Sequence, residues 1–373
     1  MKHLLCLALF CAASLNILHA QANSLTFPAS GGNIPSGIYQ RLGVTDIDIR
    51  WDAPGVKGRE GKIWGTTVAH YGFQNLGFGT AKESPWRAGA NENTTIKFST
   101  DVSIEGKKLA AGKYGFHIAL NADSCTLIFS KNSGAWGSYF YNPAEDVLRV
   151  TVRQQKNLLA SREWLAYVFL EPTPNSVIVA LEWERWRIPF KVEVDLPRTV
   201  VETVRAELQD SRGFLYENWV DAAEFCLQNN YNLEEALTWS NNAITQFYGV
   251  QTFRTFALKA QIEEKLGKTA DAEASMKKAL EKAAVFEIHQ YGRQLIADKQ
   301  PAKALEAFQL NYKKNGDVWP VHAGLMRGYS ATGDLKKALE HAKIALGQAP
   351  DDLNKKTLEG FIKTLSEGKA IQQ

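Results

Sequence analysis

The sequence GDLKKALEHAKIAL at residues 333–346 contains a turn followed by a helix with a narrow apolar face. The Gly-Asp pair is typical of the end of one helix and the N-cap of the next. Ala338, Ala342 and Ala345 recur at the three- and four-residue spacing that places side chains on one face of a helix. We therefore expect a helical hairpin whose second helix ends before Pro350.

Similar segments occur three more times in the second half of the chain. The four segments align at Ala236, Ala272, Ala304 and Ala338, with spacings of 36, 32 and 34 residues. These spacings surround the 34-residue period of tetratricopeptide repeats, in which small residues let paired helices pack closely. Residues 211–366 are therefore predicted to form an all-α tetratricopeptide-like array with a tail at 367–373. An unrelated helical bundle with chance spacing is the alternative.

The first half of the chain alternates with a period of two. Ile47, Ile49 and Trp51 alternate with charged residues, as in a strand with one buried and one solvated face. Eight or nine such short runs, separated by turn signals and without intervening helices, predict an antiparallel β-sandwich or jelly-roll-like domain over residues 23–196. A barrel is the alternative. A linker at 197–210 would join this domain to the repeats.

The composition is that of a globular protein with balanced charge. Of the 373 residues, 45% are hydrophobic and 22% are charged, and 43 Lys and Arg against 40 Asp and Glu give a formal net charge of +3. A nucleic-acid-binding domain shows a clear basic excess, so this balance excludes nucleic acid as an expected partner. The length corresponds to two or three domains of ~150 residues.

The first residues have the features of a secretory signal peptide. A short basic start is followed by an apolar stretch of roughly 15 residues and by the small residues Ala-Gln-Ala at 20–22. We expect a signal peptide at 1–22 and a periplasmic or extracellular (secreted) protein; an uncleaved anchor is the alternative. No window of the mature chain approaches the ~20 apolar residues of a membrane span, so we expect no transmembrane segment.

Familiar catalytic signatures are absent from the sequence. It has no H-E-x-x-H metal motif, no C-x-x-C pair, no G-x-S-x-G elbow and no Walker phosphate loop. His70 and His117 are the two histidines of the β half and are too few for a metal site. We therefore expect neither a metal nor a cofactor. Cys125 and Cys226 are expected to be buried small hydrophobes and not a disulfide.

The densest polar and aromatic cluster of the β half is WRAGANENTT at 86–95. Its candidate ligand-binding residues are Trp86, Arg87, Asn91 and Glu92, which together can orient a small polar or sugar ligand at a mouth of the sandwich. In the alternative, the same residues cap a turn and Arg87 pairs with one of the many carboxylates.

Two further candidates complete the predicted site. Arg59 ends the cluster WDAPGVKGR at 51–59, whose alternative role is a solvated hairpin, and His117 belongs to a predicted strand. Between the two clusters, the glycine-rich and non-periodic stretch 71–90 is typical of a functional loop. A site exists here if these residues converge on an open pocket.

Six segments of the β half occur together in an order that resembles the domain-of-unknown-function family numbered 2911. They are QRLGVTDIDIRWDAPGVKGR (40–59), IWG (63–65), WRAGANENTTIKFS (86–99), GKKLAAGKYGF (106–116), WGSYFYNPAEDVLRVTV (136–152) and ALEWERWRIPFKV (180–192). The resemblance covers about residues 35–195 and implies an exported β domain, followed by helical repeats in some members, with no assigned activity. This sequence departs from the family pattern at Ala53, commonly arginine, and in an insertion at 73–84.

The two halves together favour a non-enzymatic binding protein. The array would present a groove to a protein or peptide partner, and the β domain would hold a second ligand or an envelope component. One alternative is an extracytoplasmic hydrolase or carbohydrate-active enzyme with its site at Arg87, Asn91 and Glu92. Glycoside cleavage needs paired carboxylates, and the sequence does not identify a second one. A purely structural envelope component is the other alternative.

Overall fold

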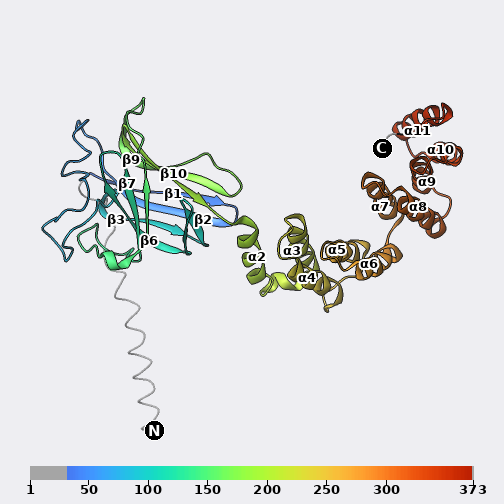
Figure 1. The fold of residues 1–373 in the computed structure, drawn as a ribbon, viewed down its shortest axis with the longest axis horizontal. Helices are drawn as coiled ribbons and strands as arrows, with labels where there is room; N and C mark the ends of the chain where they lie inside the picture. Colours follow the sequence, from blue (N-terminus) through green and yellow to red (C-terminus); the bar gives the residue numbers. More distant parts are fainter. Residues whose placement is uncertain (1–31, 372–373) are drawn as a thin grey trace, which may run out of the picture. The chain divides into compact units, whose positions relative to one another are not determined.

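A computed structural model describes residues 32–371, and the chain divides into two compact units between Val200 and Val201. The predicted signal peptide at 1–22 lies outside the described residues, as do the last two residues of the predicted tail. The first unit is built of β-strands and the second of α-helices (Figure 1). No helix within residues 32–371 is long and apolar enough to cross a lipid bilayer.

The first unit consists of two antiparallel sheets. One has the strand order β1-β2-β3-β6-β7-β8 and the other β5-β4-β11-β10-β9. The strands are β1 (Ile34–Leu42), β2 (Thr45–Ala53), β3 (Ala90–Phe98), β4 (Val102–Ile104), β5 (Lys107–Leu109), β6 (Gly112–Leu120), β7 (Cys125–Ser130), β8 (Asp146–Val152), β9 (Arg162–Leu170), β10 (Ser176–Glu184) and β11 (Trp186–Glu193). The predicted antiparallel β domain is confirmed. Period-two alternation had indicated nine of these strands but not β1, which is mostly exposed, or the three-residue β5.

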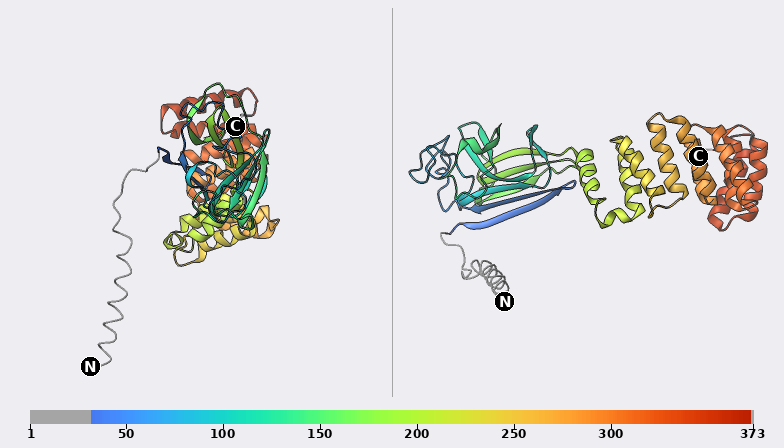
Figure 2. Two further views of the ribbon diagram at one scale, coloured as in Figure 1. Left: turned by 90° about the vertical axis from the view of Figure 1, so that its left-hand side faces the viewer. Right: turned by 90° about the horizontal axis from the view of Figure 1, so that it is seen from below.

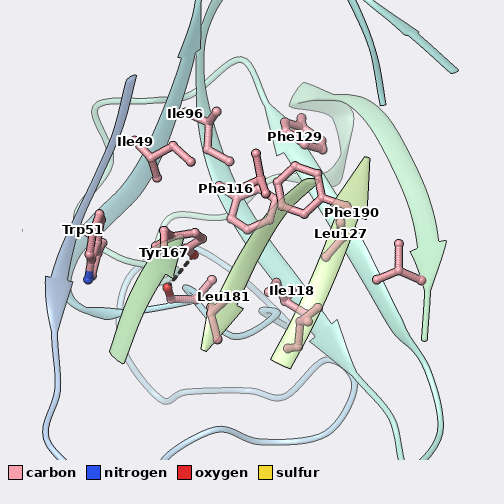
Figure 3. Close-up of a cluster of buried hydrophobic side chains, with 14 of the residues drawn as sticks. Ile49, Trp51, Ile96, Phe116, Ile118, Leu127, Phe129, Tyr167, Leu181 and Phe190 are labelled. Atoms are coloured by element: carbon pink, nitrogen blue, oxygen red, sulfur yellow. Dashed lines mark hydrogen bonds between the residues drawn. The ribbon is translucent and has the colours of Figure 1, made fainter. Parts of the chain in front are cut away.

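An aromatic layer fills the space between the two sheets (Figure 3). The Phe116 ring on β6 lies 5.7 Å from the Phe190 ring on β11 and 6.2 Å from the Tyr167 ring on β9. The Trp51 indole on β2 donates to the carbonyl of Leu165 on β9 at 3.0 Å. Each large apolar side chain buried in this layer contributes ~1.5–3 kcal/mol to the free energy of unfolding.

The segment 197–210, predicted to be a linker, is largely helical, because α2 covers Leu196–Glu207. Val201 and Leu208 are buried, and Val204 packs against the same apolar cluster, so the segment has the spacing of a helix with one apolar face.

One residue within the predicted tail at 367–373 is packed against the array. Ile371 is buried, and its amide donates to the Ser330 hydroxyl at 3.0 Å. This residue therefore packs on the array instead of extending into solvent.

The second unit is an array of paired helices that follow one another in a row (Figure 2). The pairs are α3/α4, α5/α6, α7/α8 and α9/α10, and α11 follows them. The helices are α3 (Tyr216–Gln228), α4 (Leu233–Thr245), α5 (Phe253–Lys265), α6 (Thr269–Lys282), α7 (Val285–Ala297), α8 (Pro301–Asn315), α9 (Trp319–Ala331), α10 (Leu335–Gln348) and α11 (Asp352–Ser366). The four alanines that aligned the repeats, Ala236, Ala272, Ala304 and Ala338, are all buried in the second helix of a pair. The predicted helical-hairpin array is confirmed.

The ring of Phe308 on α8 packs against glycines of the two neighbouring helices. A Cβ atom would lie 2.4 Å from this ring at Gly292 of α7, 2.5 Å at Gly324 of α9 and 2.8 Å at Gly328. No side chain fits at these separations, so close approach requires glycine here. Packing therefore overrides helix propensity, which disfavours an interior glycine by about 1 kcal/mol.

The substitution Gly324→Ala is expected to lower the free energy of unfolding by roughly 1–3 kcal/mol, because the added methyl group displaces the Phe308 ring. Urea denaturation followed by far-UV circular dichroism measures the change. Gly360→Ala in α11 is the matched control, since no atom lies within 4 Å of its Cβ position, and it should be neutral or stabilising by up to ~1 kcal/mol. Equal destabilisation by both changes would contradict the close-packing explanation.

Candidate functional site

A polar cavity of about 360 Å³ lies in the β domain where β2 ends and β3 begins. The loop 54–89 between these strands provides much of its wall, and Asn33, Trp183 and the segments 90–91 and 138–139 provide the rest. Its hydrogen-bonding and charged side chains include Asn33, Arg59, His70, Arg87, Asn91 and Ser138. No aspartate or glutamate is among the lining residues. The cavity therefore presents hydrogen-bond donors and positive charge.

The backbone of Ala88 determines where the neighbouring Arg87 stands. Ala88 has a φ of 52°, and its carbonyl accepts hydrogen bonds from the Tyr167 hydroxyl at 2.9 Å and the Thr94 hydroxyl at 3.2 Å. Tyr167 is completely enclosed by the core, and burial raises the pKa of its hydroxyl well above the usual value. A buried hydroxyl needs a hydrogen-bond partner, and Tyr167 finds it in the Ala88 carbonyl. The core therefore fixes the backbone just before β3 and, with it, the position of the Arg87 side chain.

Arg87 is held between a backbone carbonyl and two aromatic rings. Its Nη1 donates to the Asn91 carbonyl at 2.6 Å, and its guanidinium lies 4.7 Å from the Tyr139 ring and 5.7 Å from the Trp136 ring. These rings stack at 5.5 Å, and cation–π attraction favours the arrangement. A Cβ at Gly137 would lie 2.3 Å from Nη1 and would displace the guanidinium, and the φ of 60° at this position also favours glycine.

Arg59 is the second cation of the lining. Its Nε donates to the Val56 carbonyl at 3.0 Å and its Nη2 to the Gly55 carbonyl at 2.6 Å. These bonds fold the side chain back over its own turn. Among residues 32–371, neither Arg59 nor Arg87 forms an ion pair with a carboxylate. The predicted alternative, in which a carboxylate neutralises Arg87, is therefore not what the structure shows.

Four tryptophans form the apolar wall beside these cations. Trp86 and Trp183 line the cavity with their rings 6.3 Å apart and nearly parallel. Trp64 meets both edge-on, at 5.7 and 5.9 Å, and stacks on Trp186 at 4.5 Å. Trp86 and Trp183 are buried, so they give the wall rigidity and exclude water on one side.

His70 is a lining residue that the sequence analysis had not selected. Its side chain is 5% exposed, and its Nδ1 has no hydrogen-bond partner among the described residues. Burial lowers the pKa of His70, and the nearby Arg87 charge lowers it further, although a backbone hydrogen bond to Tyr71 opposes the shift. The imidazole is therefore neutral near pH 7, and its enclosed Nδ1 has an unused hydrogen-bonding capacity. Its position beside the glycine-rich stretch was the available sequence signal.

Four of the six predicted site residues line the cavity: Trp86, Arg87, Asn91 and Arg59. Glu92 does not line it: its side chain is exposed, and its amide donates to the Asp52 carboxylate at 3.4 Å. The enzymatic alternative placed its carboxylate at Glu92, and the lining supplies no other acid.

His117 also lies outside the lining, behind Ser138. It projects from β6 to the face opposite the aromatic layer, where its Nδ1 lies 3.1 Å from the Ser138 hydroxyl and its ring packs edge-on against Tyr141. Burial lowers the pKa of His117 to about 3, with a smaller contribution from the Arg87 charge. His117 therefore supports the cavity wall and is a neutral, interior side chain.

The possible metal ligands of residues 32–371 do not cluster, and the two cysteine thiols of this range are buried. Residues 32–371 contain no group of three or more His, Cys, Asp or Glu side chains placed to hold a metal ion. Cys125 and Cys226 are both free and buried, as expected. Burial raises the pKa of the Cys125 thiol to about 12 and that of Cys226 to about 11, so neither is an activated nucleophile.

The fold and the cavity define a two-part architecture, a two-sheet β domain with a cationic pocket followed by a helical-repeat array. Residues 35–192 match the model of the family described as "Protein of unknown function (DUF2911)", which confirms the resemblance seen in the sequence.

Solved structures similar to this chain include two repeat proteins. One is YrrB, described as a TPR protein with an unusual peptide-binding site; it is 16% identical, and the match covers 45% of this chain and 88% of YrrB with a TM-score of 0.27. The other is a tetratricopeptide repeat protein from Parabacteroides merdae, 13% identical, covering 46% of this chain and 70% of that one with a TM-score of 0.30. Among curated proteins, none matches the sequence significantly.

Acidification is expected to destabilise the β domain through His117. Its pKa is about 3 in the folded state and 6.5 in the reference state. The unfolded chain therefore binds the proton more readily, and stability is lost as the pH falls below 6.5. The loss attributable to this group is roughly 3 kcal/mol at about pH 4.

Denaturant unfolding of the wild-type protein and His117→Gln, followed by tryptophan fluorescence at neutral pH and at about pH 4, measures this contribution. The variant should lose less stability than the wild type between the two conditions, because glutamine does not titrate there. Parallel losses in both proteins would show that other groups control the acid response.

Proposed function

We propose that the protein is exported and acts by binding: the helical array docks a protein or peptide segment, and the β domain holds a second ligand or an envelope component. The docking role of the array rests on one observation, a groove of about 820 Å³ between the α5/α6 and α7/α8 hairpins. Its apolar lining includes Ala260, Met276, Leu280 and Leu310. A groove of this size suits several residues of a partner chain.

The groove is longer than this single hollow. A neighbouring hollow of about 500 Å³ shares Gln261, Met276 and Tyr291 with it, so the two form one continuous surface across α5, α6 and α7. Phe286, which is 57% exposed, extends the apolar surface there. An elongated groove with exposed apolar side chains favours an extended or helical segment over a compact small molecule.

Side chains from α8 hold the walls of the groove in place. The Lys314 ammonium donates to the carbonyls of Leu280, Glu281 and Ala283 at 3.1, 2.8 and 2.6 Å, which caps the C-terminal end of α6. The Asn311 amide donates to the Val285 carbonyl at the start of α7 at 3.0 Å. The turn between the hairpins is therefore fixed, and a preformed groove binds with less ordering cost.

Charges of both signs surround the apolar surface of the groove. They are Glu264, Glu273, Glu281, Lys277, Lys303, Lys313 and Lys314. Four lysines therefore face three glutamates, and one of the four, Lys314, is held by backbone carbonyls. This balance favours a partner segment with apolar anchors and mixed charge, and it matches the nearly neutral charge of the whole chain.

Leu310→Asp is expected to abolish partner capture, because it places a charge where an apolar anchor would be buried. Affinity capture from envelope extract, read by mass spectrometry, compares this variant with wild type. Leu353→Asp on α11 is the matched control: this leucine is 76% exposed and lies outside the groove, so its partners should be those of the wild type. Identical partners for Leu310→Asp and wild type would remove the groove from the proposal.

Export rests on the basic start, the apolar stretch and the small residues at 20–22. The mature protein is expected to lack roughly the first 22 residues and to leave the cytosol, since the signal peptide is removed on translocation. Intact-mass measurement after cell fractionation tests this. A protein of full mass in the cytosolic fraction would contradict it, and deletion of 1–22 should retain the protein inside the cell.

A further inference from the structure

We propose that the β-domain cavity binds a small organic acid, whose carboxylate or phosphate group lies against Arg59 and Arg87. This inference rests on the proposed ligand-holding role of the β domain, to which it adds the chemical class of the ligand. It does not depend on the helical array.

The charge of the cavity is the first argument. Two half-buried guanidinium groups line it, and no carboxylate does. Taking cations out of bulk water without an anion is unfavourable, and an anionic ligand relieves that cost. The cavity therefore discriminates in favour of anions over neutral or cationic molecules of the same size.

Two carboxylates near the Arg59 turn accept hydrogen bonds from backbone amides and do not pair with the arginine. Glu163 accepts a hydrogen bond from the amide of Lys57 at 2.9 Å, and Glu184 accepts one from the amide of Gly61 at 2.5 Å. Both amides belong to the turn that carries Arg59. The two carboxylates stabilise this turn and leave the guanidinium of Arg59 without an internal counter-ion.

The hydrogen-bonding capacity of the lining is the second argument. A guanidinium has five N–H donors; Arg87 uses one on the Asn91 carbonyl, and Arg59 uses two on backbone carbonyls. The Asn91 side-chain oxygen accepts from the Asn33 amide at 3.0 Å, which leaves the Asn91 amide nitrogen as a donor. These remaining donors match the several lone pairs of an oxyanion.

His70 adds an independent observation that points to a ligand. Its side chain is 95% enclosed and lines the cavity, and its Nδ1 lacks a partner among residues 32–371. A buried polar atom without a partner is unfavourable by about 1–3 kcal/mol. Nδ1 itself is shielded from solvent, so a ligand supplies that partner when the His70 ring turns this nitrogen toward the cavity.

An aromatic shelf beside the cavity indicates what the rest of the ligand is. Phe78, Trp136, Tyr139 and Phe140 line a shallow hollow of about 330 Å³, and Tyr139 also lines the cavity. Phe78 is 74% exposed and Trp136 is 54% exposed. Arg87 lies against both Trp136 and Tyr139 and so joins the two surfaces. The ligand is therefore a flat or ring-containing acid, with its anionic group in the cavity and its ring on the shelf.

Calorimetric titration of the full chain with three probes tests the proposal. Phenylacetate and phenyl phosphate carry a ring and an anion of either kind, and benzyl alcohol carries the ring alone. At least one acid should bind, the alcohol should not, and binding of the acid should weaken with added salt. Comparing the two acids distinguishes a carboxylate ligand from a phosphate ester.

Substitutions identify the residues responsible. Arg59→Gln and Arg87→Gln should each weaken binding of the acid roughly tenfold or more, because each removes a charged hydrogen-bond donor. Arg87→Lys keeps the charge but not the fork of donors, so an intermediate affinity is expected. Arg153→Gln is the control, since it removes the same charge from an exposed position outside the cavity. Near-UV circular dichroism verifies that each variant keeps its tryptophan packing.

Several outcomes would overturn the inference. Failure of both acids to bind the wild-type protein, equal affinity for benzyl alcohol, or unchanged affinity in Arg59→Gln, Arg87→Gln and Arg87→Lys each contradicts an anion site. These outcomes leave the array proposal intact, because partner capture is measured separately. Conversely, Leu310→Asp should bind the acid as the wild type does, so loss of partner capture alone does not affect this inference.

Discussion

Two hydroxyl groups that share one carbonyl oxygen hold the β-domain site in place. Tyr167 and Thr94 both donate to the carbonyl of Ala88, and the Tyr167 ring lies in the aromatic layer between the sheets. Leaving such a buried hydroxyl unpaired is unfavourable by about 1–3 kcal/mol. The energy that holds the sheets together therefore also determines the backbone at Ala88, and the adjacent Arg87 is directed to Gly137 and the aromatic rings around it.

The architecture of each half follows from periodicities that are visible in the sequence. Alternation around Ile49 predicted a two-faced strand, and this residue is buried in the core between the sheets. The alanines at intervals of 36, 32 and 34 residues predicted helix pairs, because small residues let paired helices pack closely. Expectations failed where the pattern was weak: β5 has three residues of which only one is buried, and α2 lies between the two periodic halves of the chain.

The candidate site was only partly predictable, because convergence depends on the path of a long loop. Trp86 and Arg87 were predicted because they belong to one local cluster of polar and aromatic residues. Arg59 lies 27 positions before Trp86 and reaches the same cavity only because loop 54–89 folds back. Glu92 is a neighbour in sequence but its side chain is exposed outside the cavity, because the backbone turns at Asn91, whose φ is 49°. The sequence predicted that the array presents a groove, but not where it lies or which residues line it, because that depends on the separation of two hairpins and not on the repeat within each.

The β-strands provide the core and the loop provides much of the cavity lining, and this separation has an evolutionary consequence. The strands carry the buried aromatic layer, whereas Arg59 and His70 lie on an irregular connection of β2 to β3. Surface connections tolerate replacement and changes of length far better than packed strands do. Related proteins are therefore free to acquire different chemical preferences by exchanging residues of this connection, while inheriting the same scaffold unchanged.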